Sequence, residues 1–235
     1  AAATTGIGVA FLLLLATAGS AQAQSRFGDK GQLVITGENL FALSTEKLVQ
    51  ATGAGDQTLT SNRFGFLYSQ GGGPVSPHGP QVGGHYFIIP QLSIGATIGY
   101  ESRGGSLEAP VGGNVVVKRD TTDFSTFILM PKVGYALMFN NIIGFWFRGG
   151  VGYFRAGQSN PNDTNDRDSY SFLLLSADAL FVVSPVPHFG FYVGPQADLA
   201  VTGSFSNRER NVESSWSAGY RSLGLGLGLL GHFDL

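Results

Sequence analysis

Apolar and polar residues alternate at the end of the chain. Leucine or phenylalanine stands at 223, 225, 227, 229, 233 and 235, and glycine, histidine or aspartate at 224, 226, 228, 232 and 234. Successive side chains of a β-strand point to opposite faces, so this segment has one apolar face and one small or polar face. The polar face carries charge and no covering element follows, which favours lipid outside and a polar lumen inside over a soluble sandwich.

Alternating segments of this kind recur along the chain, and each meets or exceeds the roughly 9–11 residues that a tilted strand needs to cross a bilayer. The sequence therefore predicts an all-β fold, an eight-stranded antiparallel up-and-down transmembrane β-barrel. The predicted strands are 31–44, 80–89, 91–103, 122–139, 142–156, 169–183, 188–206 and 214–235.

Short and long connections alternate between these segments along the chain. Three are tight, at 89–91, 140–141 and 184–187, and they alternate with long polar ones at 45–79, 104–121, 157–168 and 207–213. Short periplasmic turns and long extracellular loops are typical of outer-membrane barrels, and eight strands put both termini at the periplasmic end. The stretch Arg63–Tyr68 is strand-like. We expect it to extend a hairpin beyond the membrane, although a kinked second strand or a ten-stranded barrel stays open.

The parity of each strand assigns its faces consistently. The charged residues in the middle of the strands fall on the inner face, where they avoid the cost of about 2–4 kcal/mol that Lys or Arg incurs against lipid at mid-depth. The residues predicted to face lipid include Leu33, Ile35, Phe41, Leu43, Phe127, Leu129, Val133, Phe145, Phe147, Val151, Leu173, Leu175, Phe191, Val193 and Leu199.

The inner face carries a predicted polar cluster, formed by Glu38, Glu101, Lys132, Arg148, Asp178 and Asp198. The four residues other than Glu101 and Asp198 lie at similar distances from the short turns, so we expect them to share one layer. An eight-stranded barrel is just wide enough for side chains to fill its interior. Two acids and two bases are therefore interpreted as a plug that joins opposite walls, with a gated ion path as the alternative.

The beginning of the chain resembles an export signal. An apolar run at 7–18 precedes Ala21-Gln22-Ala23, a small-x-small cleavage pattern, and the run is too short for a membrane-spanning helix. We expect a signal peptide at 1–23 and one barrel domain at 24–235. Charged residues make up 13% of the chain, there is no cysteine, and the net charge is -2. These values favour a membrane barrel and argue against thiol chemistry and nucleic-acid binding.

The sequence gives little support for a catalytic function. We expect His85 and His232 to face inward, His188 to lie at a periplasmic turn and His78 to lie in the first long loop, with no His–Ser pair near the long loops. The loop Asn160–Asp168 is dense in Asp and Asn and could offer oxygen ligands to calcium, but a solvated loop is the favoured reading. We therefore predict no catalytic residues, no metal and no cofactor.

The signal-like segment, the eight-strand pattern, the inward charges and the closing strand together resemble the small eight-stranded outer-membrane proteins of the outer-membrane-protein-A and -X type. That resemblance implies residence in the cell outer membrane among lipid and lipopolysaccharide, assembly by the outer-membrane insertion machinery, and a monomer. The favoured function is a non-enzymatic scaffold that presents extracellular loops for interaction or adhesion. A narrow channel and a barrel enzyme acting on lipid or peptide are the alternatives.

Overall fold

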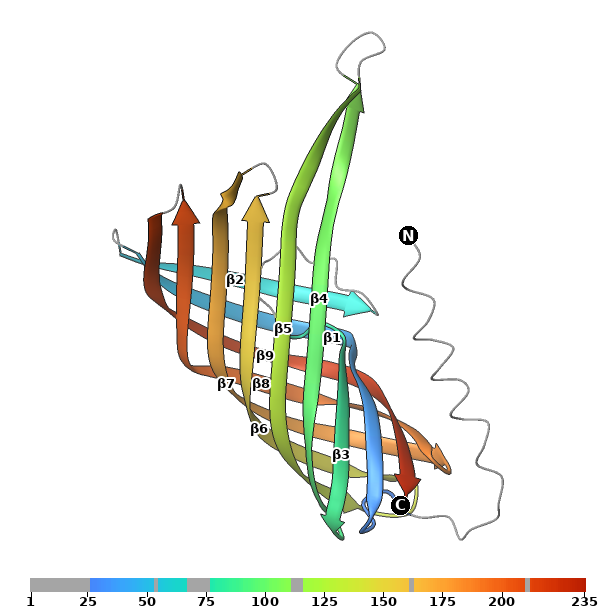
Figure 1. The fold of residues 1–235 in the computed structure, drawn as a ribbon. Helices are drawn as coiled ribbons and strands as arrows, with labels where there is room; N and C mark the ends of the chain where they lie inside the picture. Colours follow the sequence, from blue (N-terminus) through green and yellow to red (C-terminus); the bar gives the residue numbers. More distant parts are fainter. Residues whose placement is uncertain (1–25, 53–54, 67–76, 111–115, 161–162, 210–211) are drawn as a thin grey trace.

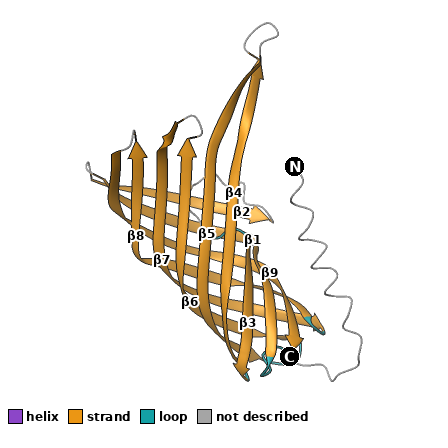
Figure 2. Ribbon diagram, viewed as in Figure 1, coloured by secondary structure: helices purple, strands orange, loops and turns teal. Residues whose placement is uncertain are grey.

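The computed structural model describes residues 26–52, 55–66, 77–110, 116–160, 163–209 and 212–235, so the expected signal segment lies outside it. These residues form antiparallel strands joined by turns, and none of them forms a helix that could cross a membrane (Figure 2). The strands are β1 (Gln32–Thr52), β2 (Gly55–Phe66), β3 (Gln81–Ile89), β4 (Leu92–Pro110), β5 (Val116–Met138), β6 (Ile143–Asn160), β7 (Asp163–Val186), β8 (Phe189–Glu209) and β9 (Val212–Asp234).

Eight of these strands close into a ring, which confirms the predicted barrel. Each strand from β3 to β9 pairs with the next, and β9 pairs with β1 to close the ring. The first part of β1 pairs with β3, while its second part, from Phe41 to Thr52, pairs with β2. The described part of the strand-like stretch, Arg63–Phe66, thus belongs to the β1–β2 hairpin and adds no ninth strand to the ring, while residues 67–68 lie outside the described part of the chain.

The change of partner along β1 coincides with a β-bulge. The pairing with β9 shifts register between Gly37 and Phe41, and Asn39 within this gap has a φ of 55°. Asn tolerates this left-handed backbone better than most residues, and a bulge bends the strand locally. Glu38 therefore comes from the kinked point of β1.

The polar connections predicted at 104–121, 157–168 and 207–213 are mostly strand, so the predicted strand ends were too early. The hairpin of β4 and β5 continues to Pro110 and Val116 and stands above the others in Figure 1 (green). Backbone pairing satisfies the same N–H and C=O groups in water as in lipid, so it continues where the apolar alternation ends. We call the end of the barrel that carries these extended strands the hairpin end.

The opposite end carries the three predicted tight turns, and we call it the short-turn end. Asn140 shapes one of them, because its Oδ1 accepts hydrogen bonds of 2.8 Å from the backbone N–H groups of Ile142 and Ile143. Gln91 and His188 adopt positive φ values of 72° and 66° in the other two. The C-terminus reaches the same end, where Leu235 N–H donates to the Gly31 carbonyl at 3.2 Å.

The outer face of the ring is apolar, as parity predicted. Leu223, Val133 and Ile98 on three different strands expose 65%, 54% and 51% of their surface. An exposed band of this kind around a closed sheet is stable in lipid and not in water, since apolar surface in water is costly.

The inner face is less polar than predicted. Apolar layers lie on both sides of the charged residues: Trp146, Leu180 and Tyr192 belong to the one at the short-turn end, and Met130, Phe154 and Phe172 to the one toward the hairpin end. Phe27, which precedes β1, closes the short-turn end and packs edge-on against Trp146 at a centroid distance of 5.4 Å. The lumen of so narrow a ring is filled like a protein core, with the charges enclosed at mid-height.

The alternating glycines of β9 leave space for side chains that fill the lumen. A Cβ at Gly226 would overlap the Gln196 amide, and a Cβ at Gly228 would overlap the Tyr192 hydroxyl. The small face of β9 therefore leaves room for large side chains from β8 inside the lumen.

Candidate functional site

Four charged side chains from different walls meet inside the barrel, and we call Glu38, Lys132, Arg148 and Asp178 the ionic layer. Arg148 is bonded to Glu38 by two contacts, Nη1–Oε1 at 2.5 Å and Nη2–Oε2 at 3.2 Å. Its Nε and Nη2 also lie 3.1 Å and 2.9 Å from Asp178 Oδ2. The guanidinium thus holds both carboxylates at once, in the forked geometry that arginine favours.

Lys132 completes the charge balance. Its Nζ lies 2.9 Å from Asp178 Oδ2 and 3.6 Å from Glu38 Oε2. All four residues of the ionic layer are at most 6% exposed. Two cations facing two anions make the layer neutral, which offsets part of the large cost of taking the charges out of water.

The surroundings of the ionic layer leave it little room. The Arg148 guanidinium lies 4.8 Å from the centre of the Trp146 ring and 5.7 Å from that of Tyr192, within the range of cation–π attraction. On the opposite wall, Thr36 Oγ1 donates to Glu38 Oε1 at 2.8 Å. The cavity that remains beside the layer measures about 20 Å³, which is room for about one water molecule.

The structure separates the two remaining residues of the predicted cluster. Asp198 borders the same small cavity as the ionic layer. Glu101 borders a different cavity on β4, beside the segment Pro77–Pro80. The four residues expected to share one layer are joined by ion pairs, while Asp198 is adjacent and Glu101 lies higher on the wall.

His78 lies in the connection between β2 and β3, within the predicted first long loop, and this part of the connection is folded into the lumen, where His78 is 5% exposed. Its Nε2 lies 2.8 Å from Ser222 Oγ and 3.3 Å from Asp198 Oδ2, and Ser222 Oγ donates to Asp198 Oδ2 at 3.2 Å. Sequence reasoning missed this His–Ser–Asp contact because the three residues are far apart in the chain.

The geometry of this contact differs from a nucleophilic relay. In a relay the acid holds one ring nitrogen and the other nitrogen takes the proton of the serine, whereas here both partners approach Nε2. All three side chains are also buried, at no more than 7% exposure. The contact fixes the segment Pro77–Pro80 across the lumen, and Gln81 adds a hydrogen bond from its amide to the Pro77 carbonyl.

The other histidines lie where parity placed them. His85 and His232 are buried in the lumen, and the His85 ring packs edge-on against Trp146 at 4.8 Å. His188 sits in its turn, with Nδ1 2.9 Å from the His232 carbonyl oxygen. The stretch 160–168, which we expected to be a solvated loop, is strand on both sides of residues 161–162, because β6 runs to Asn160 and β7 begins at Asp163. The described residues contain no group of three or more His, Asp or Glu side chains placed to hold a metal.

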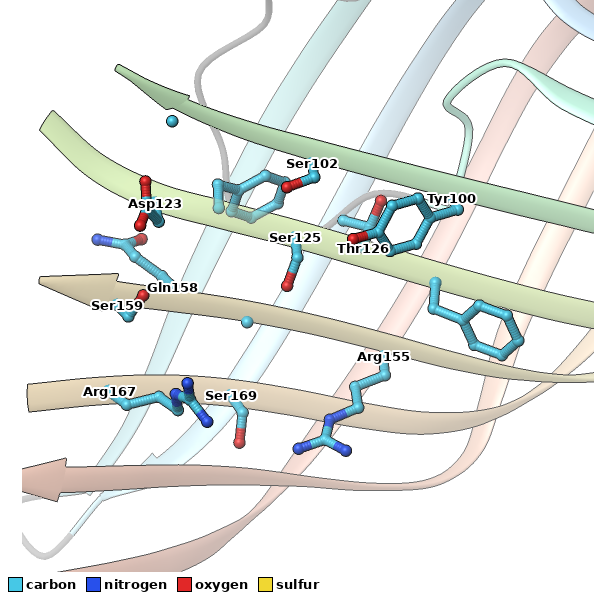
Figure 3. A pocket seen from close by; sticks show the side chains of 14 residues that line it. Tyr100, Ser102, Asp123, Ser125, Thr126, Arg155, Gln158, Ser159, Arg167 and Ser169 are labelled. Atoms are coloured by element: carbon cyan, nitrogen blue, oxygen red, sulfur yellow. The ribbon is translucent and has the colours of Figure 1, made fainter. Parts of the chain in front are cut away.

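A hollow of about 440 Å³ lies on the outside of the barrel, over β4 to β7, and we call it the outer hollow. Figure 3 shows polar side chains gathered there, among them Asp123, Arg155 and Arg167. Arg155 follows Tyr153 on the outward parity of β6 and is exposed. The parity of the predicted strand 142–156 could have identified Arg155 as an outward charge, but the other residues came from stretches predicted as loops.

The closed ring and its apolar outer band decide the class of the molecule. The chain is a transmembrane β-barrel. In lipid every backbone group must be paired within the protein, and a closed antiparallel sheet satisfies that condition without an open edge. Eight strands with tight turns at one end are the architecture of outer-membrane proteins, the location predicted from the sequence.

No family model and no curated protein sequence matches this barrel. Among solved structures it is similar to the outer-membrane protein OprG of Pseudomonas aeruginosa (TM-score 0.47, 10% identity, 91% of this chain and 100% of OprG covered). It is also similar to the outer-membrane protein AlkL (0.47, 10%, 92% and 96%) and to the outer-membrane protease OmpT of Escherichia coli (0.44, 11%, 91% and 100%).

Proposed function

We propose that this barrel is a non-enzymatic outer-membrane scaffold that presents its extended hairpins at the cell surface for interaction or adhesion. One observation carries the proposal: the lumen is filled by side chains at three successive levels, while strand pairing continues well beyond the apolar band. The β4–β5 hairpin pairs as far as Pro110 and Val116. From Phe127, the last apolar outward residue of β5, to Val116 this amounts to about 35 Å at roughly 3.3 Å per residue.

The filled lumen argues against the channel alternative. An ion moving along the axis would have to pass two apolar layers and the ionic layer, whose charges are already bonded to one another. Beside that layer the cavity measures only about 20 Å³. Moving ions through such a core would require the barrel wall or the ion pairs to open.

A conductance measurement tests this part of the proposal. The mature chain, 24–235, is refolded into a planar bilayer, and its folding is checked by the heat-dependent shift of gel mobility. We expect no steady single-channel current from the folded protein. Reproducible current from the wild-type barrel, abolished by a substitution in the ionic layer, would replace the scaffold proposal with the channel alternative.

A trimmed hairpin tests the adhesive role. Ser106 and Asp120 lie directly opposite each other on β4 and β5, so residues 107–119 can be replaced by Asn-Gly, a sequence suited to a tight hairpin turn. Cells producing the full or the trimmed chain are compared for adherence to epithelial cells and to one another. The proposal expects adherence to fall severalfold with the trimmed chain while the barrel stays folded.

A matched control shortens another hairpin. Arg208 and Glu213 lie opposite each other on β8 and β9, so an Asn-Gly turn between them removes only a short tip and is expected to leave adherence unchanged. Equal adherence by the full and β4–β5-trimmed chains would contradict the adhesive role.

A further inference from the structure

The outer hollow lies where the barrel leaves the lipid. Along β6 the outward residues run Phe147, Val151 and Tyr153, all exposed, and then change to Arg155. Phe127 on β5 and Ser171 on β7 are the residues opposite Arg155. The outward side chains thus change from apolar to polar at this row on β6 and β7 and one outward position farther, at Ser125, on β5. Such a change is expected at the boundary between hydrocarbon and head groups.

Two arginines of the hollow have no partner among the described residues. Arg155 and Arg167 are exposed, and none of the hydrogen bonds or ion pairs within the described chain engages their guanidinium groups. Arg167 lies directly opposite Arg208 on β8, and like charges at directly opposed positions are unfavourable unless something of opposite charge lies near them. Arg208 faces Glu213 on its other side, so Arg167 is the less compensated of the two.

The barrel wall between the two arginines carries only small side chains. Gly157 on β6 pairs with Ser169 on β7, and Ser125 on β5 lies on the other side of Gly157. Ser171, opposite Arg155, and Arg167 are four positions apart on β7, so the two guanidinium groups originate about 13 Å apart along the barrel wall. A sugar that carries a phosphate at each end matches this separation, because each guanidinium can then engage a phosphate of its own.

We propose that the outer hollow binds the phosphorylated sugar head group of a lipid in the outer leaflet. The arginines would each take a phosphate in the forked geometry of guanidinium–phosphate pairs, and serine hydroxyls such as those of Ser125 and Ser169 would hydrogen-bond the sugar. Tyr100 and Phe127 at the lower border would contact the start of the acyl chains. This inference rests on the placement of the barrel in the membrane and is independent of any adhesive role of the hairpins.

One acidic residue works against this ligand. Asp123 borders the hollow on β5, opposite Ser159, and Ser159 in turn lies opposite Arg167. Its carboxylate repels phosphate and weakens binding. Removing that charge should tighten binding, an effect in the direction that damage to the fold would not produce.

The test uses the full barrel refolded in detergent micelles and titrated with diphosphorylated lipid A, with the same lipid A after removal of both phosphates, and with phosphatidylglycerol. Bound lipid is counted by native mass spectrometry. We expect Arg155→Gln and Arg167→Gln each to weaken binding of diphosphorylated lipid A about tenfold, the energy of a charged hydrogen-bonded contact. Asp123→Asn should strengthen it severalfold.

Arg221→Gln is the matched control, because Arg221 is an exposed outward arginine on β9, outside the hollow. It should leave binding unchanged. The proposal is overturned if the Arg155→Gln, Arg167→Gln double variant binds lipid A as Arg221→Gln does, or if removing the phosphates has no effect. Equal, arginine-dependent binding of phosphatidylglycerol would also overturn it, because the site would then recognise anionic lipid without regard to the sugar.

Discussion

Arg148 and Arg155 stand seven positions apart on the same strand and show what each face of this barrel does with a positive charge. Arg148 points inward, is 3% exposed, and is held by Glu38 and Asp178. Arg155 points outward, is exposed, and borders the outer hollow. The inner charge is already compensated by partners within the fold, whereas the outer charge is available to a ligand.

Among the substitutions that test this contrast, we expect Arg148→Met to have the largest effect on stability. It leaves two buried carboxylates with Lys132 alone, and breaking a buried ion pair in this way typically costs about 3–5 kcal/mol. We expect the free energy of unfolding in urea, followed by the β-sheet circular dichroism of the barrel in lipid vesicles, to fall by that amount.

Arg155→Met is its control. An exposed surface side chain without a structural partner usually changes stability by less than about 0.5 kcal/mol. Similar losses from the two variants would show that the inside and outside charges do not differ as described.

Two adjacent glycines on β3 test the same difference between the inner and the outer face. Gly83 points into the lumen, where a Cβ would overlap Thr36 Oγ1 and crowd Glu38, while a Cβ at Gly84 on the outer face would meet nothing within 4 Å. Overpacking of this kind costs about 1–3 kcal/mol, so we expect Gly83→Ala to lower the free energy of unfolding by that amount. Gly84→Ala should have almost no effect, and a larger loss from it than from Gly83→Ala would contradict the described packing.

The smallest effect is expected at a pair of serines on β9. Ser222 bonds to His78 and Asp198 inside the lumen, while Ser217 is exposed on the outside. Ser222→Ala should cost about 1–2 kcal/mol, because it leaves buried groups without a hydrogen-bond partner. Ser217→Ala should be close to neutral in the same urea titration. If Ser222→Ala is neutral as well, the segment Pro77–Pro80 is held in the lumen by other contacts.

Some of the site could be predicted and some could not, for reasons visible in particular residues. Parity assigned Glu38, Lys132, Arg148 and Asp178 to the inside, because each side chain of a strand points either to the lumen or to the lipid, and a charged side chain is unfavourable against lipid. The same rule says nothing about contacts across the lumen of a sheared barrel, so it could not show that Asp198 meets His78 while Glu101 borders a separate cavity.

The sequence by itself determined the membrane-spanning parts of the strands, their faces, the positions of the tight turns and the membrane class, because each depends on neighbours in the chain and on the solvent outside. The tertiary structure alone decided what meets inside the ring. It brought His78 to Asp198 and Ser222, closed the short-turn end with Phe27, and placed Arg155 and Arg167 at one hollow. Such contacts depend on register and on how the ring closes, and these are set by the packing of the whole barrel.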